Sequence, residues 1–138
     1  MFSFNKEERL CNQKQIELLV KTSDSFLVYP IKVGYVLTTD LSQKPHIFLN
    51  FPAKVLITVS KRRYKHAHDR NRLKRLLREV YRLQKNGLYD ALKQKNMGIL
   101  IQFSYIAKEE QPFLEIKTRA AKCFLKLTQI VEATATDL

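Results

Sequence analysis

Hydrophobic residues between positions 70 and 85 recur every three or four residues, which is the spacing of an amphipathic α-helix. The apolar stripe consists of Leu73, Leu76, Leu77, Val80 and Leu83. The side about opposite the stripe is nearly all basic and consists of Asn71, Lys74, Arg75, Arg78, Arg82 and Lys85, while Arg70 and Arg72 flank the stripe. We expect Asp69 to cap the amino end of this helix and Asn86-Gly87 to end it. The pattern therefore predicts a helix that packs through its leucines and exposes its cations.

Three further stretches have the composition of β-strands. Residues 26–38 predict a strand that is bent or interrupted at Pro30, and alternation within one strand would place Phe26 and Tyr29 on opposite faces. Residues 53–60 are almost wholly apolar, as expected of a strand covered on both faces. Residues 96–106 predict another strand, with its large side chains on one face.

The remaining periodic segments predict helices at residues 6–21, 88–95 and 113–133. Residues 40–52 contain two prolines and predict a loop, in which 46–51 could form a short strand. The order of elements indicates an α+β protein, a two-layer α/β sandwich in which helices pack on a small sheet. A length of 138 residues predicts a single domain spanning 1–138.

Positive charge is concentrated in residues 61–85, which hold 11 of the 25 Lys and Arg residues and two of the 13 acidic residues. The net charge of this segment is +9 (11 minus 2), whereas the rest of the chain sums to +3 (14 minus 11). Solvated helices usually alternate charges in i,i+4 pairs, and here Glu79 is the single acid within the helix. We therefore favour a nucleic acid as partner over an ordinary solvated surface.

The sequence offers little for protein-based catalysis, and we predict no catalytic residue and no metal ligand. It contains no Walker loop, no GxSxG and no GxGxxG motif. Cys11 and Cys123 have no metal-ligand spacing, and His66 and His68 lack further partners for a zinc site. No apolar run is long enough for a membrane span and no signal peptide is recognisable, so we expect a cytoplasmic protein without membrane contact.

The motif Arg70-Asn71-Arg72, in RNRLKRLLRE, follows the strand end Val59-Ser60-Lys61-Arg62 within about a dozen residues. This arrangement resembles the signature of the bacterial ribonuclease P protein subunit, and Phe26-Leu27-Val28-Tyr29 resembles that family's Phe-x-x-Tyr strand. The loop between the two motifs is one residue longer than is common in the family and contains no glycine. Ile16 and Val20 stand where many members have phenylalanines on the first helix.

The resemblance implies an α/β sandwich with a left-handed crossover between parallel strands. It also implies a protein subunit that assists a catalytic RNA in removing the 5′ leader of precursor tRNA, with magnesium bound by the RNA. The expected partners are the ribonuclease P RNA, precursor tRNA, and anions such as phosphate or sulfate. The RNA-binding residues implied are Lys61, Arg62, Arg70, Asn71, Arg72, Lys74, Arg75, Arg78 and Arg82. The leader-binding cleft implied is formed by Ile16, Val20, Phe26 and Tyr29.

Two alternatives remain open at this point. The chain could be a structural RNA-binding protein, similar to a ribosomal protein, without a role in cleavage. A DNA-binding basic helix is less favoured, because no leucine zipper follows the basic segment and no helix-turn-helix pair is evident.

Overall fold

The computed structural model describes residues 6–10, 13–22, 24–38 and 51–134. Its elements in chain order are η1 (Lys6–Glu8), α1 (Gln13–Thr22), β1 (Asp24–Val28), β2 (Ile31–Thr38), β3 (Ala53–Val59), α2 (Ala67–Gln84), α3 (Asn86–Gln94), β4 (Gly98–Tyr105) and α4 (Phe113–Ala133). The predicted α+β fold is confirmed. The possible short strand at 46–51 and Cys11 lie outside the described residues, except Phe51.

The four strands form one sheet in the order β1-β2-β4-β3. β1 and β2 are antiparallel, as are β2 and β4, whereas β3 and β4 are parallel neighbours. The chain therefore leaves β3, passes through α2 and α3, and returns to the sheet beside β3. This is the connection that the family resemblance implies, and its left hand stays a prediction.

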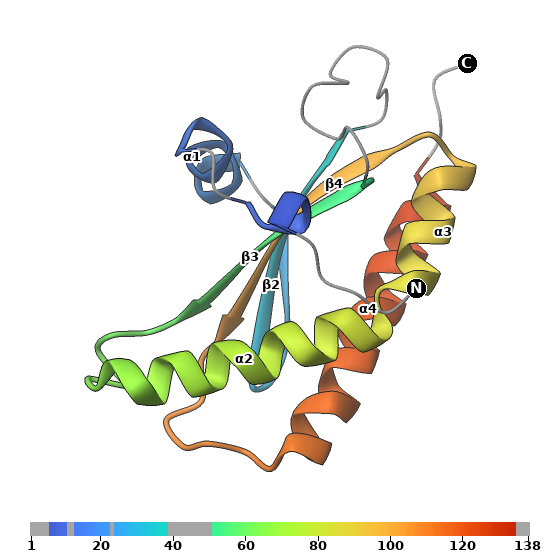
Figure 1. Ribbon diagram of the computed structural model, residues 1–138. Coiled ribbons are helices and arrows are strands. Elements are labelled where there is room, and N and C mark those ends of the chain that lie inside the picture. Colours follow the sequence, from blue (N-terminus) through green and yellow to red (C-terminus); the bar gives the residue numbers. More distant parts are fainter. Residues whose placement is uncertain (1–5, 11–12, 23, 39–50, 135–138) are drawn as a thin grey trace.

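The helices cover the two faces of the sheet unequally (Figure 1). Helices α2, α3 and α4 pack on the face that carries Val33, Val55, Ile101 and Phe103, and this layer contains the main core. Helix α1 lies on the opposite face, where Leu19 packs with Leu10 and Leu100 in a smaller cluster. Among the described elements, α1 is the helix on this second face, and it covers only part of it.

The predicted strand at 26–38 is two strands joined by a tight turn at Tyr29-Pro30, whose peptide bond is cis. Pairing of Phe26 with Val33 and of Leu27 with Lys32 places each pair on one face of the sheet. Phe26 thus faces the main core, and Leu27 shares the α1 face with Lys32. The predicted interruption at Pro30 is confirmed, but it is a turn that reverses the chain and pairs the two halves antiparallel, not a bend within one strand.

Two helix boundaries also differ from the prediction. The segment predicted as one helix at 6–21 consists of η1 and α1, and between them Arg9 pairs with Val55 of β3. Asp69 does not cap α2, since the helix begins at Ala67 and Asp69 lies in its first turn. α2 and α3 are separated by Lys85 alone, whose backbone is helical.

Candidate nucleic-acid interface

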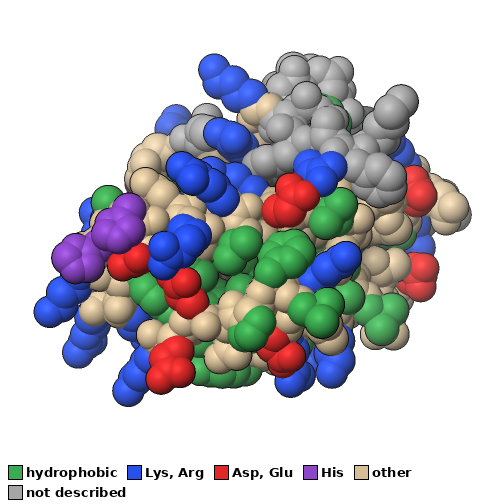
Figure 2. All heavy atoms as spheres, turned by 60° about the horizontal axis from the view of Figure 1, so that its bottom comes forward, with side chains coloured by type: hydrophobic (Ala, Val, Ile, Leu, Met, Phe, Trp, Pro, Cys, Tyr) green, Lys and Arg blue, Asp and Glu red, His purple; other side chains and the backbone are tan. Residues whose placement is uncertain are grey.

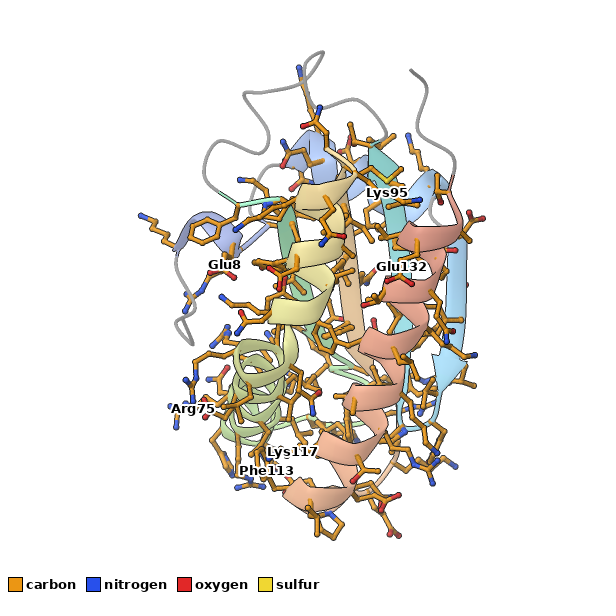
Figure 3. The ribbon with its side chains drawn as sticks, turned by 90° about the vertical axis from the view of Figure 1, so that its right-hand side faces the viewer. Glu8, Arg75, Lys95, Phe113, Lys117 and Glu132 are labelled. Atoms are coloured by element: carbon orange, nitrogen blue, oxygen red, sulfur yellow. The ribbon has the colours of Figure 1, made fainter. Side chains whose placement is uncertain are left out.

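The exposed side of α2 carries several cations, and some of them form no ion pair with a carboxylate of the described residues. Asn71 and Arg75 are exposed, and Lys74 and Arg78 are half-buried. Within the part of the chain that the structure describes, no ion pair involves Lys74, Arg75 or Arg78. Figure 3 shows Arg75 pointing outward from α2, away from the sheet and from α4. The leucine side of α2 packs inward as predicted, with Leu73, Leu77 and Val80 buried.

Arg70 has a structural role that the sequence pattern did not indicate. Its Nη1 donates to the carbonyl oxygens of Tyr64 and Lys65, at 2.7 and 3.0 Å. The guanidinium group therefore holds the loop between β3 and α2 against the first turn of α2. Arg70 lies at the edge of the cationic surface, and some of its donors serve the fold.

Arg72 and Arg82 are paired with carboxylates of the chain. Arg72 donates to Asp69 at 3.0 Å and also bonds Glu110, while Arg82 bonds both carboxylate oxygens of Glu79. Exposed ion pairs of this kind contribute only about 0–1 kcal/mol, so a phosphate group can compete for these arginines. Figure 2 shows acidic side chains and hydrophobic ones among the basic ones on this side of the molecule.

Lys85 does not belong to the exposed cationic side, which corrects the prediction from helical spacing. Its side chain is 3% exposed, and its Nζ bonds both carboxylate oxygens of the fully buried Glu8. The hydroxyl of Tyr89 also donates to Glu8, at 2.7 Å. A partner 77 residues away in the sequence therefore draws this lysine into the interior.

The loop between β3 and α2 presents a second group of cations. Lys61, Arg62 and Arg63 are exposed, and Arg62 and Arg63 line a cavity of about 490 Å³ together with Lys108. The Oγ of Ser60 accepts from the backbone amides of Arg62 and Arg63, which shapes this turn. Arg63 lies within the basic segment but was not among the predicted RNA contacts. Lys108 lies far from that segment in the sequence, and the residues around it do not indicate that it belongs to a cationic surface.

A tyrosine anchors the same loop to the end of β4. The Tyr64 hydroxyl donates to the carbonyl oxygen of Ala107 at 2.8 Å. Burial, with the nearby Tyr105 and Glu110, raises the pKa of Tyr64 to about 12. The buried side chain of Tyr64 therefore fixes the basic loop to the rest of the fold.

A cleft of about 320 Å³ opens on the α1 face of the sheet. It is lined by Val20, Ser25, Lys32, Gly34, Gln102 and Ser104. Beside it, the hydroxyls of Thr58 and Ser104 are hydrogen-bonded at 2.8 Å. The lining is mostly polar, with one cation and one apolar side chain, which suits a polar chain molecule better than an apolar ligand.

The structure brings only part of the predicted cleft together. Val20 lines the cleft, while Ile16 is half-buried against the small cluster beneath α1. Phe26 lies on the other face, where it packs against Tyr35 and beneath the ammonium group of Lys126. Tyr29 is 55% exposed at the turn between β1 and β2 and does not line the cleft.

Sequence reasoning missed the polar residues of the cleft. Lys32 alternates with Ile31 and Val33 of β2, a pattern that does place it on the face opposite these two residues. Gln102 and Ser104 alternate with the apolar residues of β4, a pattern that does place them on the face opposite Phe103.

The described residues contain no group of three or more His, Cys, Asp or Glu side chains that could hold a metal ion. Among the same residues, no helix is long and apolar enough to cross a membrane.

Comparison with known proteins gives a consistent result. The family model described as Ribonuclease P matches residues 4–128. A ribonuclease P protein component from Porphyromonas gingivalis is 30% identical over 134 residues, covering 97% of this chain and 93% of the relative. Another from Chlorobaculum tepidum is 40% identical over 86 residues, covering 59% of this chain and 53% of the relative.

Solved structures share the fold. The ribonuclease P protein from Thermotoga maritima superposes with a TM-score of 0.64 at 19% identity, covering 86% of this chain and 96% of that one. The corresponding protein from Staphylococcus aureus gives a TM-score of 0.60 at 18% identity, covering 90% of this chain and 97% of that one.

Proposed function

Because this chain belongs to the ribonuclease P protein family, we propose that it is the protein component of a ribonuclease P ribonucleoprotein and takes part in maturation of the 5′ end of tRNA. The catalytic RNA of the complex carries the chemistry, and this chain supplies binding and positioning. The observation that carries the proposal is the pairing of two surfaces on one small fold. One is the cationic side of α2 with the loop before it, and the other is the polar cleft beside α1.

The cationic surface is assigned to the RNA subunit. Arginine forks can bond phosphate oxygens in pairs, so Arg75 and Arg78 suit a phosphate backbone in close contact. Lys61 and Arg62, at the end of β3, extend the contact beyond the helix, and Arg72 and Arg82 join it when phosphate displaces their carboxylates. Screening of phosphate repulsion between RNA segments then favours a compact complex.

The cleft is assigned to the single-stranded leader of precursor tRNA. Lys32 offers one charge for a phosphate, and Gln102 and Ser104 offer hydrogen bonds. Val20 provides an apolar contact for a base, with little demand on its identity. Phe26 is not part of this assignment, because it faces the main core.

Magnesium is expected on the RNA, where the ion would polarise the scissile phosphate and activate water. The contribution of this chain would be to hold the RNA subunit and the precursor tRNA in position relative to each other.

Reconstitution tests the proposal. We expect the purified chain alone to leave precursor tRNA intact, and to restore its cleavage by the cognate ribonuclease P RNA at low magnesium concentration. The structural RNA-binding alternative predicts tight binding of the RNA without any stimulation of cleavage. Stimulation by the chain with Arg75→Gln and Arg78→Gln should be weaker than by the unmodified chain.

A further inference from the structure

A buried polar cluster ties the amino-terminal segment to the junction between α2 and α3. We call Glu8, Lys85 and Tyr89 the amino-terminal latch. Lys85 bonds both carboxylate oxygens of Glu8, and the Tyr89 hydroxyl reaches the same carboxylate while it contacts the Tyr81 hydroxyl at 2.7 Å. Since these groups are buried, the latch fixes the position of the end of η1 and of the backbone of the residue that follows it.

That next residue is Arg9. Its side chain is exposed, and its backbone pairs with Val55 of the edge strand β3, on which α2 packs. The amide of Leu10 donates to the carbonyl oxygen of Val55 at 2.9 Å, which fixes the chain on the far side of Arg9 as well. Arg9 is therefore held from both sides.

The latch also determines which part of α2 lies near Arg9. Lys85 and Arg78 are seven residues apart, so they lie on the same side of the helix about 10 Å apart along its axis. Arg75 precedes Arg78 by three residues and is its neighbour on the helix surface. Figure 3 shows Glu8 and Arg75 along the same edge of the molecule. Burial lowers the pKa of Arg78, and the charges of Arg9 and Arg75 lower it further, in agreement with both arginines lying near Arg78.

Three guanidinium groups that repel one another favour an anion between them, and the amino-terminal segment contributes one of the three. We propose that Arg9 is an RNA-binding residue, and that Arg9, Arg75 and Arg78 together hold one phosphodiester group of the RNA subunit. The latch positions Arg9 for this contact. The proposal rests on the proposed function, because the ligand is the RNA of the ribonucleoprotein.

The choice of RNA follows from continuity. Arg75 and Arg78 adjoin Asn71 and Lys74 on α2, so the proposed site continues a cationic surface instead of forming an isolated pocket. A small anion would occupy one such site and leave the rest of the cationic surface without a ligand. A nucleic-acid backbone presents phosphates at regular intervals and can occupy the whole surface.

A double-mutant cycle tests the shared contact. Dissociation constants for the cognate ribonuclease P RNA are measured for the unmodified chain, Arg9→Gln, Arg78→Gln and the double variant. We expect each single change to weaken binding about five- to tenfold, as for loss of one charge-assisted hydrogen bond. The double variant should lose clearly less than the product of the two effects. Lys122→Gln, an exposed change of equal charge on α4, is the matched control and should stay within twofold.

The cycle has outcomes that overturn the proposal. An Arg9→Gln variant that binds as tightly as Lys122→Gln removes Arg9 from the interface. Strictly multiplicative effects of Arg9→Gln and Arg78→Gln mean that the two residues hold different phosphates. If the unmodified chain neither binds the RNA nor stimulates cleavage, the proposed function itself is wrong, which is a different result from either of these.

The positioning role of the latch has its own test. In a chain carrying Glu8→Gln and Lys85→Met, the additional change Arg9→Gln should alter RNA affinity by less than twofold. A further fivefold loss in that background shows that Arg9 needs no latch. Should the latch-free chain fail to fold, Tyr89→Phe replaces it, because this change removes one hydrogen bond from Glu8 and keeps the ion pair. There Arg9→Gln should cost less than in the unmodified chain, and an equal cost again overturns the positioning role.

Discussion

The ammonium group of Lys85 lies 2.6 and 2.7 Å from the two carboxylate oxygens of Glu8, and the two side chains are 3% and 0% exposed. The pair is completed by the Tyr89 hydroxyl and by the ring of Tyr89, whose centroid lies 5.3 Å from the Lys85 ammonium. Desolvation makes each charge costly unless the other is present, so the two residues depend on each other.

Replacing Lys85 by methionine should lower the free energy of unfolding by about 3–5 kcal/mol, because Glu8 would remain buried without its counter-ion. Urea denaturation monitored by circular dichroism measures this change. Adding Glu8→Gln should recover a large part of the loss, since the uncompensated charge is then gone. A double variant no more stable than Lys85→Met alone would contradict this explanation.

Alkaline pH should destabilise the fold, partly through Tyr64. Burial raises the pKa of Tyr64 to about 12, while a tyrosine in the unfolded chain ionises near pH 10. The unfolded chain therefore binds fewer protons than the folded one between about pH 10 and 12, and stability falls as the pH rises through this window.

Burial raises the pKa values of Tyr81 and Tyr89 as well, so Tyr64→Phe should weaken the alkaline loss without abolishing it. Denaturation curves at several pH values between 8 and 11 measure the difference. Identical pH dependence in the variant and the unmodified chain would count against this role of Tyr64.

Cys123 should be unreactive in the folded chain. Burial raises the pKa of its thiol to about 12, and the side chain is inaccessible within α4. In a chain with Cys11→Ser, labelling by a disulfide reagent at pH 8 should be slow and should accelerate sharply in urea. Rapid labelling of the native chain would show that this part of the core opens.

Glu110→Gln should strengthen RNA binding about two- to fivefold, because it releases Arg72 from an exposed ion pair of modest energy. Filter binding at fixed salt measures the change. Glu115→Gln, which removes an acid paired with Arg119 on α4, is the control for net charge alone. Equal gains from both variants would attribute the effect to net charge.

Lys32→Gln should weaken binding of precursor tRNA to the reconstituted complex about three- to tenfold, because the cleft would lose its charge for a leader phosphate. Affinity for mature tRNA, which has no leader, should stay unchanged. Lys54→Gln, also on a strand of the sheet but outside the residues lining the cleft, is the control. A similar loss with both tRNAs would place Lys32 outside the leader path.

The elements with strong periodicity were predictable from local sequence. The leucine stripe of α2 and the apolar strand β3 were recognised because each pattern repeats within its own segment, and the bounds of α4 match the prediction. The cationic side of α2 followed from the same repeat. These features depend on neighbours a few residues apart, which is the range at which such patterns carry information.

The features that were not predicted depend on distant partners or on the direction that the chain takes after a turn. Lys85 occupies a helical position that faces solvent by spacing, and only Glu8 draws it inward. In one continuous strand, alternation would place Leu27 on the same face as Ile31 and Phe26 on the other face. The turn at Pro30 reverses the chain, so Phe26 shares the face of Ile31 and Leu27 does not. Lys108 enters the cavity at Arg62 and Arg63 through the tertiary fold alone.

The place of β4 between β2 and β3 has a consequence for synthesis of the chain. Among the described strands β3 pairs with β4 alone, and β4 is synthesised after α2 and α3. The ion pair of Glu8 with Lys85 and its hydrogen bond from Tyr89 likewise form only after residues 85–89 have been made. Since translation proceeds from the amino end, β1 and β2 can pair early, but β3 lacks its strand partner until β4 emerges. A stalled chain of which only residues up to 97 have left the exit tunnel should therefore be protease-sensitive, and emergence of β4 should bring protection.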